Sequence, residues 1–168
     1  KILPSYDFTC ALNQLGAVHC WGNYENGVLG PDATNNEPKQ IHFPGNLNVI
    51  DIAGMGTDGV CALVEHAKPD ASLFCWGSGD SPMQLTATPQ AVTGLVSSML
   101  NYDVELPYFP SSPAVLSAGG RNTCVVVENG EVVCWGRNEN FESGQPGAGY
   151  TLQPSKVNGV PSLKRVYA

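Results

Sequence analysis

The chain has 168 residues and a formal net charge of −7, with only eight Lys and Arg residues against fifteen Asp and Glu. This length suffices for one domain with a hydrophobic core, and the acidic balance without a basic stripe argues against nucleic acid as a partner. Nineteen Gly and thirteen Pro residues are typical of short strands joined by turns, and no apolar run reaches transmembrane length.

The first predicted element is a pair of short strands around Cys10 and Cys20. If these cysteines face each other across an antiparallel pair, the three-residue loop Gln14-Leu15-Gly16 remains between the strands. Gly16 then occupies the loop position that requires a left-handed backbone. The spacing therefore predicts a three-residue hairpin with the two cysteines on one face.

The same phrase, cysteine, apolar run, turn and Cys-Trp-Gly, occurs again at Cys61 to Gly77 and at Cys124 to Gly136. Opposing Cys124 and Cys134 leaves the loop Glu128-Asn129-Gly130, again with Gly in third place. A two-residue Asn-Gly turn would instead place these cysteines on opposite faces. The middle copy has a longer excursion at 66–70 that leaves its turn undefined.

All six cysteines lie in these phrases, which predicts three disulfides within the hairpins: Cys10–Cys20, Cys61–Cys75 and Cys124–Cys134. The alternatives are buried free thiols or metal ligands, but zinc ligands prefer pairs two to four residues apart. We therefore expect no metal and no cofactor. Paired cysteines indicate an oxidising compartment, so the protein is expected to be extracellular, secreted or on the cell surface. Lys1 to Pro4 is too short for a signal peptide.

Trp21, Trp76 and Trp135 each follow a cysteine directly, so each points to the opposite face of its sheet. This pattern predicts that the three tryptophans pack between neighbouring sheets, as blade-packing residues in a repeat architecture. Stacking on a ligand is the alternative.

The residues 78–113 between the second and third copies form an irregular insertion, in which Pro107 to Pro113 is excluded from central strands. Ser111 and Ser112 lie in this Pro-rich stretch and are candidate O-glycosylation sites on an extracellular chain. Residues 91–100 form an ambiguous apolar run, and helices are expected to be few and short.

No catalytic set is found, so the chain is predicted not to be an enzyme. His19, His42 and His66 belong to different segments, and Gly77 to Ser81 lacks the strand–helix context of a nucleophilic serine. A calcium site near Asp32, Glu139 and Glu142 is conceivable, but their spacing matches no known calcium loop.

The phrase as a whole resembles the repeat of the regulator of chromosome condensation family. The resemblance lies in Val115 to Cys124, Asn129 to Asn140 and Gly144-Gln145, in the Ile-Ala-Gly before Cys61, and in Asn23 to Gly30 after Trp21. It covers most of the chain outside residues 78–113. The resemblance implies an all-β fold, a propeller-like array of about three blades of short antiparallel strands, and the cysteines resemble secreted members of the family.

The chain is accordingly expected to be a single propeller-like repeat domain over residues 1–168, with repeats at about 1–48, 49–113 and 114–162. An apolar strand precedes the first cysteine in copies two and three, at 49–54 and 115–119, whereas copy one is expected to lack it. The chain ends in what reads as the same strand, a predicted assembly strand of Leu163, Lys164, Arg165, Val166, Tyr167 and Ala168. Three interpretations remain: a fragment of a longer propeller, donation of this strand to the next chain, or a compact three-blade closure.

Two functions follow. The first is a non-catalytic extracellular structural protein, a subunit of a head-to-tail filament or surface array that self-associates through C-terminal strand donation. The second is a secreted propeller that binds or inhibits a protein partner through the loops after the three tryptophans, with Tyr24, Phe141 and Tyr150 as anchors. A nucleotide-exchange role like that of the nuclear family member is disfavoured by the paired cysteines and the acidic charge.

Overall fold

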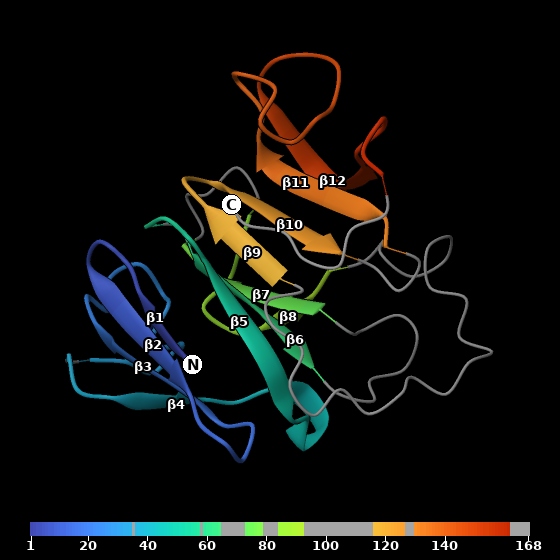
Figure 1. The fold of residues 1–168 in the computed structure, drawn as a ribbon. Helices are drawn as coiled ribbons and strands as arrows, with labels where there is room; N and C mark the ends of the chain where they lie inside the picture. Colours follow the sequence, from blue (N-terminus) through green and yellow to red (C-terminus); the bar gives the residue numbers. More distant parts are fainter. Residues whose placement is uncertain are drawn as a thin grey trace.

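The computed structural model describes residues 1–34, 36–57, 59–64, 73–78, 84–92, 116–126 and 130–161. These residues form three four-stranded antiparallel sheets, and their only helix is the short 3-10 turn Pro44–Asn46. The prediction of an all-β fold with blades of four short strands is therefore confirmed. Figure 1 shows the sheets side by side, with β5 in the middle between β1 and β9.

Each sheet is a meander in which consecutive strands pair. Sheet 1 comprises β1 (Ile2–Pro4), β2 (Phe8–Leu12), β3 (Val18–Gly22) and β4 (Lys39–Ile41). Sheet 2 comprises β5 (Val49–Met55), β6 (Gly59–Val64), β7 (Leu73–Gly77) and β8 (Gln90–Ala91). Sheet 3 comprises β9 (Leu116–Gly119), β10 (Asn122–Val126), β11 (Val132–Arg137) and β12 (Tyr150–Lys156). The three sheets thus lie within the three predicted repeats.

The hairpin register follows the spacing of the cysteines. Cys10 faces Cys20, Cys61 faces Cys75, and Cys124 faces Cys134 across their strand pairs. Leu12 pairs with Val18, and the Asn13 N–H donates to the Ala17 carbonyl, so the turn is the predicted loop ending in Gly16. Gly16 and Gly130 have φ values of 76° and 81°, the left-handed conformation that these loop positions need.

The expectation that the first copy lacks its leading strand is wrong. β1 pairs with β2 through Ile2–Ala11, Leu3–Cys10 and Pro4–Thr9, the place that β5 and β9 occupy in the other sheets. The Lys1 carbonyl accepts from the Leu12 N–H at 2.8 Å and extends this pairing. The strand β1 is not apparent from the sequence because it has only three residues and one of them is Pro4. Proline has no backbone N–H to donate to a neighbouring strand, so it is tolerated only at a sheet edge.

The sheets pack face to face with their tryptophans against disulfides. Trp76 of sheet 2 lies in one core with Cys10 and Cys20 of sheet 1, and Trp135 of sheet 3 lies in the next core with Cys61 and Cys75 of sheet 2. Phe43, which follows β4, makes edge-to-face contact with Trp76 at a centroid distance of 5.6 Å. Sheet 2 therefore covers the disulfide face of sheet 1, and sheet 3 covers the disulfide face of sheet 2, so both faces of sheet 2 are removed from water.

The two ends of the sheets differ. At one end, here called the loop end, lie the β1–β2 turn (5–7), the loop after Trp21 (23–38) and the loop after Trp135 (138–149). The Ser5 hydroxyl donates to the carbonyl of Gly56 after β5, and the Asn23 N–H donates to the Asp7 carbonyl at 2.8 Å, so the β1–β2 turn is bonded to both the end of β5 and the loop after Trp21. At the other end, the hairpin end, lies the 13–17 turn. Among the described residues, no helix is long and apolar enough to cross a membrane.

Candidate functional site

The histidines do not converge. His19 is on β3 between Ala11 and Gln40, and His42 follows β4, while His66 lies outside the described residues. Within the described ranges, no three His, Cys, Asp or Glu side chains are grouped so that they could hold a metal ion.

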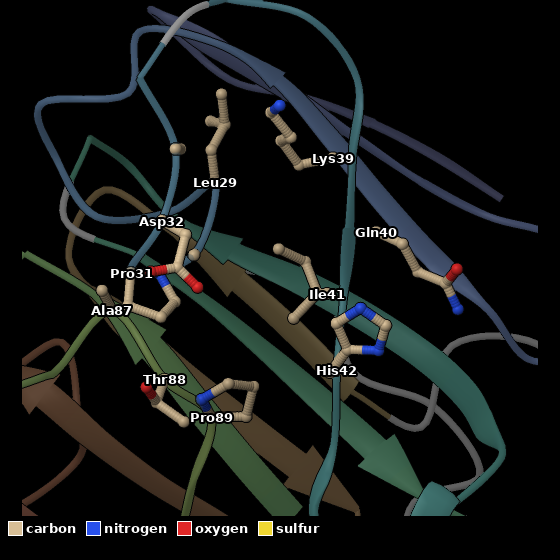
Figure 2. Close-up of a pocket in the computed structure, with 12 residues that line it drawn as sticks. Leu29, Pro31, Asp32, Lys39, Gln40, Ile41, His42, Ala87, Thr88 and Pro89 are labelled. Carbon is tan, nitrogen blue, oxygen red and sulfur yellow. The ribbon is translucent and has the colours of Figure 1, made fainter.

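A groove of about 420 Å³ lies between the loop after Trp21, the strand β4 and the segment that leads into β8 (Figure 2). Ile41, Leu29 and Pro89 are its buried apolar wall. Asp32 and Lys39, of opposite charge, also line it. Such a mixed lining, which also includes His42, could hold a short extended segment of a partner, but it does not concentrate charge of one sign.

The six cysteines form the three disulfides Cys10–Cys20, Cys61–Cys75 and Cys124–Cys134, with S–S distances of 2.03–2.11 Å. The first two bridges are buried in the two inter-sheet cores. The third lies in a separate cluster with Val132, against which Val157 packs. No described cysteine is free.

The three tryptophans are placed differently from one another. Trp76 and Trp135 are fully buried between sheets. Trp21 occupies the corresponding position in sheet 1, on the face turned away from sheet 2, and is only partly buried. Trp21 therefore lacks the cover by a described sheet that its two counterparts have.

The loop after Trp21 is attached to the β1–β2 turn. The Asn26 amide donates to Asp7 Oδ2 at 2.7 Å, and the Asn23 amide reaches the same oxygen at 3.4 Å. The second oxygen, Asp7 Oδ1, is buried and has no hydrogen-bond partner. Asp7 thus holds this loop, and the tip residue Tyr24 remains exposed.

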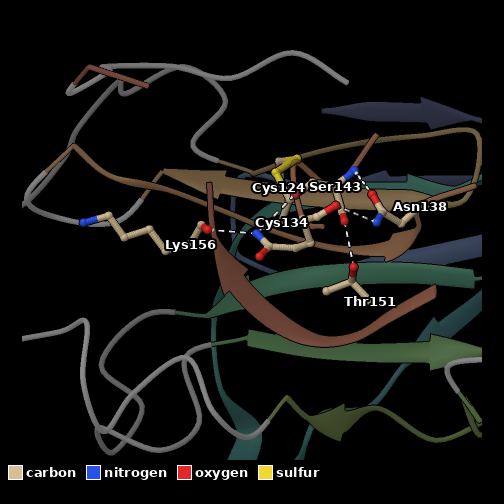
Figure 3. The surroundings of a disulfide bond; sticks show 7 residues. Cys124, Cys134, Asn138, Ser143, Thr151 and Lys156 are labelled. Atoms are coloured by element: carbon tan, nitrogen blue, oxygen red, sulfur yellow. Dashed lines mark hydrogen bonds between the residues drawn. A yellow bond between two sulfur atoms is a disulfide. The ribbon is translucent and has the colours of Figure 1, made fainter. Parts of the chain in front are cut away.

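The loop after Trp135 is built around one buried side chain, Asn138. Its Nδ2 donates to the carbonyls of Gln145 and Gly147 at 3.0 and 2.6 Å, and its Oδ1 accepts from the Ser143 N–H at 3.0 Å. The Ser143 hydroxyl in turn bonds the Thr151 hydroxyl on β12 at 2.7 Å (Figure 3). These bonds join the two halves of the loop to the sheet, so the loop has a defined shape.

The surface of this loop is acidic but partly neutralised. Arg137 forms ion pairs with Glu139 and Glu142. Glu142 also accepts a hydrogen bond from the Asn140 N–H at 2.8 Å. Backbone hydrogen bonds from Glu142 itself and from Asn140, with Arg137 as a smaller cause, hold the pKa of the Glu142 carboxyl below its ordinary value.

The exposed aromatic side chains gather at the loop end. Among the described large hydrophobic residues that are exposed, three are aromatic: Tyr6 (92%), Phe141 (60%) and Tyr24 (40%), all in loop-end turns. Tyr150, predicted as a third anchor, begins β12 opposite Arg137 and is half-buried. Tyr6 is not apparent from the sequence, because its turn forms only when β1 pairs with β2. The signal that could have revealed it is the Tyr6-Asp7 pair directly before the strand that begins at Phe8.

Two groups of predicted site residues lie outside the described residues. These are the assembly strand, residues 163–168, and the candidate O-glycan positions Ser111 and Ser112.

Comparison with known proteins identifies the repeats. A family model of the regulator of chromosome condensation (RCC1) repeat matches residues 16–63, and a second model of the same repeat matches residues 115–145. These two segments of the chain are therefore RCC1-like repeats. The first match includes the Trp21 loop, and the second includes Trp135 and the loop tip at Phe141.

A curated relative of this RCC1-like chain is the RCC1 domain-containing protein RUG3, mitochondrial, of Arabidopsis thaliana. It is 25% identical over 149 residues, which cover 83% of the chain and 29% of the relative. The chain thus spans less than a third of the length of that protein.

Solved structures of longer proteins share the fold. Human WBSCR16 matches with a TM-score of 0.70 and 22% identity, over 94% of the RCC1-like chain and 39% of that structure. Prp20p of Saccharomyces cerevisiae, described with its binding to Gsp1p and histones, matches with a TM-score of 0.64 and 21% identity, over 95% and 38%. Yeast RCC1 (Prp20) bound to Kap60 matches with a TM-score of 0.66 and 20% identity, over 95% and 37%. The predicted propeller-like fold is confirmed.

Proposed function

We propose that this RCC1-like chain is an extracellular, non-catalytic module that binds a protein partner through its loop end. The observation that carries the proposal is the position of the exposed aromatics in the part of the chain that the structure describes. Tyr6, Tyr24 and Phe141 lie in loop-end turns, whereas the described residues exposed at the hairpin end include the aliphatic Leu15 and Ile50. Exposed aromatic side chains on a polar surface are typical anchors of protein interfaces.

The scaffold suits this role because it is rigid. The sheets are joined by two apolar cores, and a disulfide closes one hairpin within each sheet. The loop after Trp135 is fixed by Asn138. A surface that is already ordered loses little conformational freedom on binding, which favours affinity. The similar structures of Prp20p with Gsp1p and histones, and of yeast RCC1 with Kap60, concern proteins that bind proteins, which supports the proposal by analogy.

The extracellular location rests on the three disulfides, since such bridges persist in oxidising compartments. Mass spectrometry of the native protein, alkylated before and after reduction, measures this directly. We expect no alkylation before reduction and six alkylated cysteines after it. Free thiols in the native protein would place it in a reducing compartment.

The head-to-tail filament stays a prediction. Its donor strand lies outside the described residues, and the acceptor position beside β2 is held by β1, which a donated strand would have to displace. Electron microscopy of the native protein distinguishes the two proposals. Discrete particles favour the binding module, and regular filaments favour assembly.

Two asparagines provide a matched test of the binding surface. Asn138 orders the loop after Trp135, and Asn13 does the same for the hairpin end, where its Oδ1 accepts from the Leu15 and Ala17 N–H groups at 2.9 Å. The full oxidised chain is immobilised and incubated with extracellular fluid of the source, and the retained protein is identified and titrated. We expect N138A to weaken this binding at least about tenfold and N13A to leave it unchanged.

If N13A weakens partner binding and N138A leaves it unchanged, the interface lies at the hairpin end. If the wild-type chain retains no protein at near-equal molar amount, the binding proposal fails.

A further inference from the structure

The loops after Trp21 and Trp135 make the same pair of turns. In the first, the Gly27 N–H donates to the Tyr24 carbonyl at 3.1 Å, and the Gly30 N–H donates to the Gly27 carbonyl at 3.2 Å. In the second, the Phe141 N–H donates to the Asn138 carbonyl at 3.3 Å, and the Gly144 N–H donates to the Phe141 carbonyl at 2.9 Å. Phe141 therefore occupies in the loop after Trp135 the position that Gly27 occupies in the loop after Trp21.

This position requires a left-handed backbone. The φ values of Gly27 and Phe141 are 68° and 64°. Glycine adopts this conformation without steric penalty, whereas for a bulky side chain it is an outlier that lowers the stability of the folded state. Gly27 also has no room for a side chain, because a Cβ there would lie 2.9 Å from the Gly77 carbonyl oxygen.

The Phe141 ring does not offset this strain by packing. Its side chain is 60% exposed, so most of its apolar surface faces water in the isolated chain. A residue that strains the backbone and leaves its ring in solvent contributes little to the fold. Strain of this kind points to a function outside folding.

The loop beneath the ring is firmly built. Asn138 is buried and bonds three backbone groups, and the Gln145 side chain donates to the Lys156 carbonyl at 2.8 Å, so the loop is attached to β12 (Figure 3). At the tip, the Glu142 carboxylate accepts hydrogen bonds from both the backbone N–H and the side-chain amide of Asn140. Phe141 is thus presented on a preformed platform rather than on a flexible tip.

The surroundings of the ring indicate the chemistry of what it meets. Glu139 and Glu142 lie within two residues of it, and Arg137 pairs with both, which leaves the tip with an acidic excess. The whole chain carries a net charge of −7. This charge disfavours an anionic membrane or a nucleic acid, and it complements a partner surface with Lys and Arg residues.

We propose that Phe141 is the anchor of the partner contact, inserting its ring into an apolar pocket rimmed by basic residues on a protein partner. This inference rests on the proposed function and assigns to one residue the largest share of the affinity. It also explains why a glycine position carries an aromatic residue: the ring is desolvated in the complex, and the platform keeps the ordering cost low.

The test replaces Phe141 with the residue that sheet 1 uses. F141G is made in the full oxidised chain, with L15G as the control, because Leu15 is also apolar and 83% exposed but lies at the hairpin end. Urea unfolding of F141G is expected to show an unchanged or higher midpoint, since glycine relieves the strained φ. Binding to the captured partner is expected to weaken at least about tenfold for F141G, with L15G equal to wild type.

Three results would overturn the inference. A urea midpoint for F141G below that of L15G would show that the ring supports the fold, because both variants carry the entropic cost of an added glycine. Equal partner affinities for F141G and wild type would remove Phe141 as the anchor while the proposed function stands, because the partner is still bound. Failure of the wild-type chain to bind any partner would remove both.

The identity of the occupant is tested separately. Vesicles of phosphatidylserine and phosphatidylcholine are expected not to bind the wild-type chain, and light scattering is expected to show one mass for wild type and F141G. Vesicle binding that F141G abolishes would make the occupant a lipid surface. A wild-type dimer that F141G dissociates would make it a second copy of the chain. A partner affinity that does not fall with rising salt would contradict the basic rim.

Discussion

The indole Nε1–H of Trp76 in sheet 2 donates a hydrogen bond of 2.8 Å to the backbone carbonyl of Val28 in the loop after Trp21. Val28 is fully buried, so this bond satisfies a carbonyl that water does not reach. Trp135 has the corresponding position in sheet 3, but its Nε1 is buried and has no hydrogen-bond partner among the described residues. Two tryptophans with the same place in the repeat therefore differ in one bond.

This difference predicts unequal responses to the same substitution. W76F removes indole volume and leaves the Val28 carbonyl unpaired, whereas W135F removes similar volume and an unsatisfied donor. We expect W76F to lower the free energy of unfolding by about 1–2 kcal/mol more than W135F does. Urea unfolding of both variants measures this, and equal losses would show that the Trp76–Val28 bond contributes nothing net.

The contact between the loop-end turns of sheets 2 and 3 depends on Gly56. Its φ is 57°, and a Cβ there would overlap the Gly120 carbonyl oxygen. Gly45 has a similar φ of 74° but open space around it. We expect G45A to lower stability by about 1 kcal/mol through the backbone alone, and G56A to lower it by a further 1–3 kcal/mol or so through the overlap.

Thermal or urea unfolding of the two variants tests this comparison. Similar losses for G56A and G45A would mean that the two turns can separate without affecting the cores.

Each disulfide closes a loop between cysteines 10 or 14 positions apart. In the chain-entropy picture, each such bridge contributes about 2–3 kcal/mol. The double variant C124A/C134A is expected to have a free energy of unfolding lower than that of wild type by about the contribution of one bridge. Because two of the three bridges remain, a reductant should lower the free energy of unfolding of this variant by about one third less than that of wild type. A reductant that leaves the urea midpoint of the wild type unchanged would contradict the stabilising role of the bridges.

The pKa of Glu142 predicts acid sensitivity in the loop after Trp135. Because hydrogen bonds to the ionised carboxyl lower its pKa in the folded state below the ordinary value of 4.5, its contribution is present above that value. The contribution is lost as the pH falls through the lower, folded-state pKa. We expect the Asn140 amide hydrogen to lose protection from exchange in this acidic range, after correction for the intrinsic rate.

The control for this prediction is E142Q, in which the side chain can no longer ionise. Its Asn140 amide should be less protected than that of wild type at neutral pH and should show no acid transition. An acid transition of the same size in E142Q would assign the effect to another group, such as Glu139.

Much of the local structure could be predicted from particular residues. The positions of Cys10 and Cys20 relative to Gly16 specify the hairpin register, because only one loop length puts both cysteines on one face and glycine at the left-handed position. The step from Cys75 to Trp76 places the indole on the other face, because side chains alternate along a strand. These are short-range constraints, and the chain carries them in its spacing.

The candidate site could be predicted only in part. Tyr24 and Phe141 stand out as aromatics after Cys-Trp-Gly, but Tyr6 becomes a loop-end residue only once β1 is recognised. β1 has too few residues for a periodic pattern, and it forms because the β2 edge offers unpaired backbone groups. The sequence does place Phe141 and Gly27 at the same position, six residues after the tryptophan of each repeat, but the positive φ at Phe141 is visible only in the structure.

The sequence by itself thus determined the repeat, the cysteine pairs and the all-β character, because each depends on neighbours within about ten to fourteen positions along the chain. The tertiary structure decided which tryptophan is covered, which indole finds an acceptor and which aromatics face water. Those outcomes depend on how one sheet lies against the next, and residues as far apart as Val28 and Trp76 meet only after the sheets have packed.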